Sequence, residues 1–359
     1  MHRLNPRWSA VVQLTGGLAL LLWGLLRGSI VPTDFVVRGT AGPTDQRLYE
    51  SIVRAMQGDA ARDGVGYYAA VAREQIAVGA PTSPVPTVRE PTLAWILATV
   101  GEKGAMVLLA GLVLIGFLLA MRRLEKLTTS RWEWYPATIV VGLSLLTALL
   151  VDRLWFHEVW AGVLVLTALL LVWSRWWVAA LPVALLAVAI REMAVVVPIA
   201  CFLVALRSRR RAEATGWAGV LVLSAGFYAW HAWQVHEHVP ARATGPGWTG
   251  LQGWPFVVNA SWFSSLLWAA PVAVAAAATV VALLGWLGPL GRELPQGTLA
   301  LAILFVAVGL GGRPDNLYWG ALWTPLLALG LVPGLRRSVI LAGRLVRSAD
   351  SGPAVARSA

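Results

Sequence analysis

Residues 104–121 read GAMVLLAGLVLIGFLLAM, an uncharged run that ends at Arg122 and Arg123. A helix over this run would be about 27 Å long, which is close to the thickness of the hydrocarbon core of a bilayer. No charged or amide side chain interrupts the run, so a helix here has no polar face to turn toward water. The stretch therefore predicts a membrane-spanning helix.

The composition extends this prediction to the whole chain. Of the 359 residues, 58% are hydrophobic and only 13% are charged, whereas a soluble domain carries roughly 25% charged residues. Further apolar runs of similar length lie at about 9–26, 136–151, 159–174, 176–190, 193–206, 214–233, 264–286, 297–311 and 317–335. We therefore expect an all-α polytopic membrane protein with about ten transmembrane helices.

The flanking charges predict the orientation of these helices. With the N-terminus in the cytoplasm, the inner segments carry 17 basic and 5 acidic residues, and the outer segments carry 12 basic and 13 acidic residues. The inner side is then +12 and the outer side −1, as the positive-inside rule requires. We expect a multi-pass protein of the cytoplasmic (inner) membrane with both termini in the cytoplasm. This asymmetry accounts for the net charge of +11 without a nucleic-acid partner.

The domain organisation predicted from these runs is simple. Residues 1–335 form one transmembrane domain with two large outer loops, 28–103 and 234–263, and residues 336–359 form a loose, basic cytoplasmic tail. The single cysteine, Cys201, lies in an apolar run, so the chain offers no disulfide framework and no cysteine-based metal site.

The first outer loop contains two amphipathic patterns. After Thr44, a plausible N-cap, apolar residues recur at helical spacing at 48, 49, 52, 53 and 56, and a second set follows at 65, 67, 68, 71 and 76. A proline-punctuated stretch, 81–91, leads into the next span. Because a short loop would suffice to join two spans, we interpret this segment as a roof of amphipathic helices over a cavity.

Three motifs of this loop resemble a known family. They are Asp45-x-x-x-Tyr49, then Gly66-Tyr67-Tyr68, then Arg89-Glu90-Pro91-Thr92-Leu93-Ala94-Trp95. Together they resemble the first outer loop of GT-C membrane glycosyltransferases of the aminoarabinose transferase and protein mannosyltransferase type. The resemblance implies a catalytic role for Asp45, a polyprenyl-phosphate sugar as donor and inversion at the anomeric carbon. The chain departs from the aminoarabinose branch at Glu90, where that branch has lysine.

Further charged residues stand at the predicted outer ends of the spans. The resemblance implies a second acid after the third span, where Asp152 and Glu158 both fit and Glu158 is preferred. The other candidate substrate-binding residues are Tyr49, Tyr68, Arg89, Arg191, Glu192, Arg313, Asp315 and Tyr318. Two groups among them have a structural alternative, namely a helix-end ion pair for Arg191 and Glu192, and an ordinary turn for the segment around Arg313.

Other polar and aromatic residues of the second outer loop carry weaker signals. His231, His236 and His238 have the pattern H-x4-H-x-H, which we interpret as solvated loop histidines rather than a metal site. Trp248 and Trp254 lie among glycines and are free to stack on a sugar or to pack as a lid.

These observations predict a membrane glycosyltransferase that moves a sugar from a polyprenyl-phosphate donor to a lipid or glycan acceptor on the outer face. Asp45 would act as general base toward the acceptor hydroxyl, and Arg191 or Arg313 would neutralise the leaving phosphate. A divalent cation bridging Asp45 and Glu158 stays open. The alternative is a lipid or sugar transporter or flippase, although such proteins usually carry ionisable residues inside their spans, where this chain has none.

Overall fold

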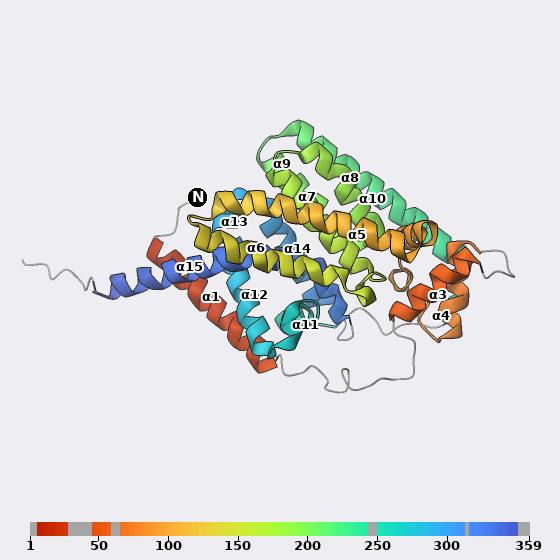
Figure 1. Cartoon of the computed structure of the whole chain (residues 1–359), viewed down its shortest axis with the longest axis horizontal. Helices are drawn as coiled ribbons and strands as arrows, with labels where there is room; N and C mark the ends of the chain where they lie inside the picture. Colours follow the sequence, from red (N-terminus) through yellow and green to blue (C-terminus); the bar gives the residue numbers. More distant parts are fainter. Residues whose placement is uncertain (1–5, 28–44, 59–64, 243–249, 313–315, 351–359) are drawn as a thin grey trace, which may run out of the picture.

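The computed structural model describes residues 6–27, 45–58, 65–242, 250–312 and 316–350 (Figure 1). Helices account for nearly all of these residues, and no strand occurs among them. The first half contains α1 (Pro6–Arg27), α3 (Asp45–Gln57), α4 (Tyr67–Ala77), the 3-10 helix η1 (Val85–Thr87), α5 (Thr92–Leu127), α6 (Arg131–Leu146), η2 (Thr147–Leu149), η3 (Val151–Arg153), α7 (His157–Trp173) and α8 (Trp177–Ile190). The second half contains η4 (Glu192–Val195), α9 (Val196–Arg207), α10 (Arg211–His238), α11 (Gly253–Phe263), η5 (Leu266–Ala269), α12 (Val272–Trp286), α13 (Pro289–Glu293), α14 (Pro295–Gly311), η6 (Leu317–Leu322) and α15 (Thr324–Asp350).

Every apolar run of the sequence falls on helical structure, which confirms the all-α class. Within the described residues, three segments are long and apolar enough to cross a membrane, namely Val85–Leu127, Val272–Glu293 and Thr324–Arg347. Shorter apolar helices cover Val11–Gly24, His157–Trp173, Trp177–Ile190 and Pro295–Gly311. The chain is therefore a helical protein with candidate membrane spans, while the full set of about ten crossings remains a prediction.

Helix α7 is the inner helix of the bundle. All of its 17 residues are buried, as expected for a helix that is apolar on every side. It packs against α5, α8 and η6. Gly162 allows η6 to approach closely, because a Cβ atom there would lie 2.2 Å from the carbonyl oxygen of Ala321 in η6. The sequence of α7 thus brings η6 against the helix turn that follows Glu158.

The two amphipathic helices predicted between the first two spans are confirmed. Helix α3 buries Leu48, Ile52 and Val53, and α4 buries Tyr67, Tyr68 and Val71 together with Gln75. Figure 1 shows α3 and α4 at one end of the bundle, while the C-terminal part of α15 lies at the other end. The two helices therefore cover one end of the bundle.

Helix α5 is divided by a kink at Gly101, whose φ of 71° lies in the left-handed region that favours glycine. The nine residues before the kink belong to the cap formed with α3, because Leu93, Ala94 and Leu97 are buried there and α3 packs on α5. The predicted span, 104–121, begins after the kink. Residues 92–100 therefore pack in the cap of the bundle, before the kink.

Three predictions about loops were wrong. Helix α10 continues through His238, and α11 occupies the end of the predicted outer loop 234–263, where it buries Trp254. Because His231 is also buried, it is not a solvated loop residue. Helix α15 continues to Asp350, so the predicted loose tail is helical over 336–350. Thr44, Trp248 and the end of the tail, 351–359, lie outside the described residues.

Candidate functional site

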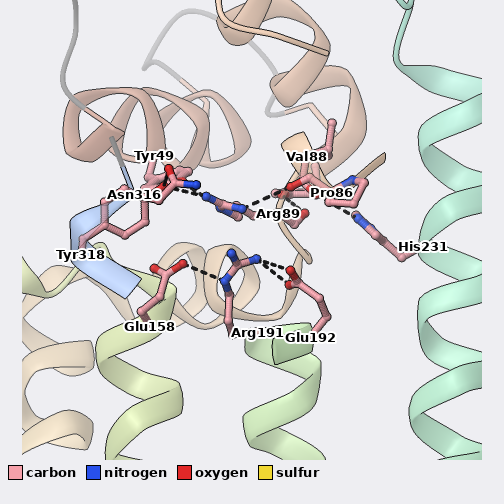
Figure 2. A network of polar contacts seen from close by, with 11 residues as sticks. Tyr49, Pro86, Val88, Arg89, Glu158, Arg191, Glu192, His231, Asn316 and Tyr318 are labelled. Carbon is pink, nitrogen blue, oxygen red and sulfur yellow. Dashed lines mark hydrogen bonds and ion pairs between the residues drawn. The ribbon is translucent and has the colours of Figure 1, made fainter. Parts of the chain in front are cut away.

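A buried guanidinium group, that of Arg89, connects three parts of the chain. Its Nε donates a hydrogen bond to the hydroxyl of Tyr49 in α3 at 3.0 Å, and its Nη2 donates to the hydroxyl of Tyr318 in η6 at 2.8 Å. Its Nη1 donates to the carbonyl oxygen of Pro86 in η1 at 3.2 Å. All three nitrogens are therefore engaged, which fixes the plane of the group (Figure 2).

A second guanidinium group, that of Arg191, lies between two carboxylates at the junction of α8 and η4. Its Nε is 2.7 Å from Oε1 of Glu158, and its Nη1 donates to both oxygens of Glu192 at 2.5 Å (Figure 2). The contact with Glu158 is an ion pair without hydrogen-bond alignment. The guanidinium also stands 5.6 Å from the ring centroid of Trp319. Arg191 and Glu158 are 1% and 0% exposed, so this is a desolvated charge pair.

Several polar atoms around this pair lack hydrogen-bond partners among the described residues. They are Nη2 of Arg191, both carboxylate oxygens of Glu158, Oε2 of Glu90 and both ring nitrogens of His157, although the backbone of Glu90 lies near the His157 ring. Buried polar groups in native proteins are almost always paired, because an unpaired group costs about 1–3 kcal/mol. The arrangement is therefore suited to a polar ligand or to water that would pair with these atoms.

Glu90 contributes a buried carboxyl group whose pKa is raised. Burial, reinforced by the neighbouring carboxylate of Glu192, raises the pKa of Glu90 well above its usual range. Glu192 keeps its charge, because the attraction of Arg191 and a hydrogen bond with Glu90 outweigh the effect of burial and lower its pKa.

Asp45 lies at the edge of this centre. It is the exposed first residue of α3, one helical turn before Tyr49. Its charge acts on the hydroxyls of both Tyr49 and Tyr318, and the charge of Glu158 acts on the same two hydroxyls. The two acids preferred from the sequence therefore belong to one electrostatic environment, in which Asp45 is accessible to solvent and Glu158 is not.

Tyr68 belongs to a neighbouring contact rather than to the charged centre. Its hydroxyl is 3.0 Å from Nδ1 of His231, and Nε2 of His231 is 3.2 Å from the carbonyl oxygen of Val88. Since His231 comes from α10, this pair holds the segment that carries Arg89 against α10 (Figure 2). The sequence analysis named Tyr68 as a candidate substrate-binding residue, whereas in the structure its hydroxyl contacts His231.

The structure brings together most, but not all, of the predicted site residues. Asp152 is exposed on η3 and makes none of the contacts described above. Arg313 and Asp315 lie outside the described residues. Two members of the centre, Glu90 and His157, were missed as site residues, although each adjoins a residue that was selected. Each is a second polar residue beside a selected charged one in an otherwise apolar stretch, and that pairing is the signal that could have found them.

No cluster of three or more histidine, cysteine, aspartate or glutamate side chains suited to a metal ion occurs in the described part of the chain.

Three cavities among the described residues lie beside the centre or elsewhere on the bundle. An apolar cavity of about 210 Å³ is bounded by α6, α11, η5, α12 and α15, with Leu143, Ala278 and Leu327 among its lining residues. A smaller cavity shares Ser144 and Thr324 with it and reaches Arg153 and Val159, the residue after Glu158. On the surface beside α10, residues 82–85 and 235–241 line a hollow of about 400 Å³.

Five separate segments thus meet at one end of the bundle, namely α3, the residues before α5, the start of α7, the α8–η4 junction and η6. Their side chains provide fixed positive charge, buried carboxylates and one exposed carboxylate. Such a combination can hold an anionic group and accept a proton beside it. No protein-family model, no curated protein and no solved structure matches this chain.

Proposed function

We propose that this chain is a membrane glycosyltransferase of the GT-C type that transfers a sugar from a polyprenyl-phosphate donor to a lipid or glycan acceptor. The observation that carries the proposal is the convergence of Arg89, Arg191 and Glu158 beside the exposed Asp45, under the cap formed by α3 and α4. A sugar phosphate needs both a cation for its phosphate and a base for the incoming hydroxyl. The centre provides both.

The phosphate is best matched by Arg191. A guanidinium binds phosphate oxygens through two parallel N–H donors, and it stays charged when it is buried. Nη2 of Arg191 has no hydrogen-bond partner among the described residues, so this donor is available to a ligand. Glu158 and Glu192 hold the group in place. Glu158 therefore acts in this scheme as a positioning residue.

The proposed reaction is a single displacement. Asp45 accepts the proton of the acceptor hydroxyl as its oxygen forms a bond to the anomeric carbon. The bond from that carbon to the phosphate oxygen breaks, and its electron pair leaves with the polyprenyl phosphate. Because attack and departure occur on opposite faces of the sugar, the configuration inverts. The leaving phosphate needs positive charge rather than a proton, and Arg191 supplies it.

The proposed topology places this centre on the outer face of the cytoplasmic membrane, with about ten crossings and both termini inside. The basic C-terminal part of α15 and the cap of α3 and α4 lie at opposite ends of the bundle, which supports this orientation (Figure 1). The apolar cavity between α6, α12 and α15 could accommodate part of a prenyl chain. In this topology, membrane lipids surround the helical bundle.

A transporter or flippase is the second candidate. The observation that favours it is the buried, incompletely paired Arg191–Glu158 couple, since transporters use such groups to bind charged substrates. The two candidates differ in whether a covalent bond breaks.

Transfer of radiolabelled sugar distinguishes them. Short-chain prenyl-phosphate pentoses and hexoses serve as donors, with membrane lipid extract as the source of acceptors. We expect Asp45→Asn to lower transfer at least 100-fold, which is in the range of general-base contributions. Asp152→Asn is the matched control, because Asp152 is also exposed but lies outside the centre, and it should keep full transfer. Full transfer by Asp45→Asn would overturn the assignment, and movement of intact donor across proteoliposomes would favour a transporter.

A further inference from the structure

His157 is a buried polar side chain of the candidate site that the proposed reaction does not use. It is the first residue of α7 and is only 4% exposed. Neither of its ring nitrogens has a hydrogen-bond partner among the described residues, although the backbone of Glu90 lies near the ring. Buried polar groups in native proteins are almost always paired. This imidazole is therefore suited to a partner that the described part of the chain does not supply.

The surroundings of His157 connect it to both ends of the proposed reaction. Its ring packs edge-on against Tyr49, with the ring centroids 5.1 Å apart. Tyr49 follows the proposed base, Asp45, by one turn of α3. The next residue of α7 is Glu158, which lies 2.7 Å from Arg191, the proposed phosphate ligand. A group bound at the imidazole therefore lies beside both the base and the phosphate site, as the donor sugar must.

The aromatic rings next to this imidazole are only partly buried. They belong to Tyr49, to Tyr318 and to Phe156, the residue before His157. Phe156 and Tyr318 pack together with their ring centroids 5.5 Å apart, and both tyrosine hydroxyls accept hydrogen bonds from Arg89. Aromatic side chains with a few polar groups among them are typical of small-molecule sites. This layer therefore matches a ligand that has both apolar faces and hydroxyl groups, as a sugar ring has.

The charge of His157 decides which kind of group it can pair with. Burial and the repulsion of Arg89 and Arg191 hold the pKa of His157 well below its usual range, so the ring is neutral at physiological pH. A neutral imidazole has one N–H donor and one nitrogen lone pair. An ionised phosphate presents only acceptors, which the lone pair repels. A hydroxyl group both donates and accepts, so it can pair with either ring nitrogen.

We propose that His157 hydrogen-bonds a hydroxyl group of the sugar carried by the prenyl-phosphate donor and thereby selects donors that have this hydroxyl. This role rests on the proposed function, from which the donor is taken. It adds a specificity-determining residue to a site in which Asp45 and Arg191 have other roles. A donor without the hydroxyl would leave the buried ring nitrogen unpaired, and a hydrogen bond of this kind contributes about tenfold in affinity.

Equilibrium binding to the full chain in detergent tests this role, with native mass spectrometry as the measurement and no acceptor present. The probes are short-chain prenyl-phosphate pentoses and hexoses, the monodeoxy forms of each, and the prenyl phosphate without a sugar. We expect one monodeoxy form to bind the unmodified chain about tenfold more weakly than its parent sugar. In His157→Phe, which keeps an aromatic ring beside Tyr49, the two affinities should become equal, while the prenyl phosphate without a sugar should bind as before.

Three further variants control this measurement. His157→Leu also removes both ring nitrogens and gives the same test where the phenylalanine variant fails to fold. His157→Gln keeps a donor and an acceptor, so it should retain part of the discrimination between the two sugars. His236→Phe makes the same substitution at an exposed histidine outside the site and should keep the tenfold difference.

Two results would overturn the role of His157. One is an unchanged tenfold difference in His157→Phe, which would mean that its ring nitrogens bind water and not the sugar. The other is an equal loss of affinity for every probe, including the prenyl phosphate without a sugar, which would show a purely structural role. Equal binding of each parent sugar and all its monodeoxy forms by the unmodified chain would overturn it as well.

The absence of an acceptor separates this role from the proposed transfer reaction. Discrimination that depends on His157, in a chain that transfers no sugar, would overturn the proposed transferase activity and leave the binding role intact. Sugar transfer by a chain whose discrimination does not change in His157→Phe would overturn the binding role alone. A chain that binds none of the probes would overturn both.

Discussion

The guanidinium of Arg89 donates a hydrogen bond of 2.8 Å to the hydroxyl of Tyr318, a residue 229 positions later in the chain. This bond connects the cap over the bundle to η6, which itself rests on the inner helix α7. Tyr49 shares the same guanidinium from α3. The loop helices are therefore attached to the bundle through a buried polar contact in addition to apolar packing.

Removing the Tyr318 hydroxyl should loosen this attachment. In Tyr318→Phe, Nη2 of Arg89 loses its partner while it stays buried, so we expect a loss of about 1–3 kcal/mol in stability. The melting temperature of the purified protein in detergent measures this loss. Tyr135→Phe is the control, because Tyr135 is 50% exposed on α6 and should melt like the unmodified chain. Equal melting temperatures for the two variants would contradict the role of this hydrogen bond.

The ion pair of Arg191 and Glu158 should show strong coupling. Glu158→Gln leaves a buried guanidinium without one of its carboxylates, and loss of one partner of a buried pair costs about 3–5 kcal/mol. Replacing both residues, as Glu158→Gln/Arg191→Met, should restore part of that stability. A double-mutant cycle from unfolding in detergent measures the coupling. The exposed pair Arg73–Glu74 provides the comparison and should show coupling below about 1 kcal/mol. A similar coupling energy in the two pairs would mean that the pair of Arg191 and Glu158 is not desolvated.

The raised pKa of Glu90 predicts a particular dependence of stability on pH. The folded chain holds this proton at a pH where the unfolded chain, with a pKa of about 4.3, has lost it. The resulting stabilisation is complete below the unfolded pKa and is lost as the pH rises through the folded pKa. Glu90→Gln cannot ionise, so its stability relative to the unmodified chain should increase from pH 5 to pH 9. A difference in melting temperature that stays constant across this range would show that Glu90 is not a buried neutral acid.

The close approach of η6 to α7 depends on Gly162. In Gly162→Ala the new Cβ atom would stand 2.2 Å from the backbone oxygen of Ala321, so η6 must move away from the helix. We expect a loss of at least 2 kcal/mol, on the scale of overpacked cores, together with weaker sugar transfer because Tyr318 moves with η6. Gly219→Ala in α10 is the matched control, since nothing lies within 4 Å of its added Cβ atom. If Gly162→Ala keeps the stability and transfer of that control, then η6 does not depend on this contact.

The sequence by itself determined the helical class and the two amphipathic helices between the first two predicted spans. It also indicated that charged residues stand at the ends of the apolar runs. These features depend on local periodicity and hydrophobicity, which neighbouring residues express directly. Leu48, Ile52 and Val53, for example, could be assigned to the buried face of α3 from their spacing alone. The ends of the helices were predicted less well from the sequence. Helices α10 and α15 continue into polar residues, whereas a span drawn from hydropathy stops where the apolar run ends.

Only the tertiary structure decided which charged side chains contact one another. Arg89, Arg191, Glu158 and Tyr318 lie on separate segments, and no local pattern pairs Arg89 with two tyrosines while Arg191 takes two carboxylates. No local pattern predicts the burial of Glu90 and His157 either, because it depends on how α3, α7 and η6 pack together. Hydrophobic patterning determines that a helix is buried, but the partner of a charged side chain depends on the directions and separations of groups brought together only when the whole chain packs.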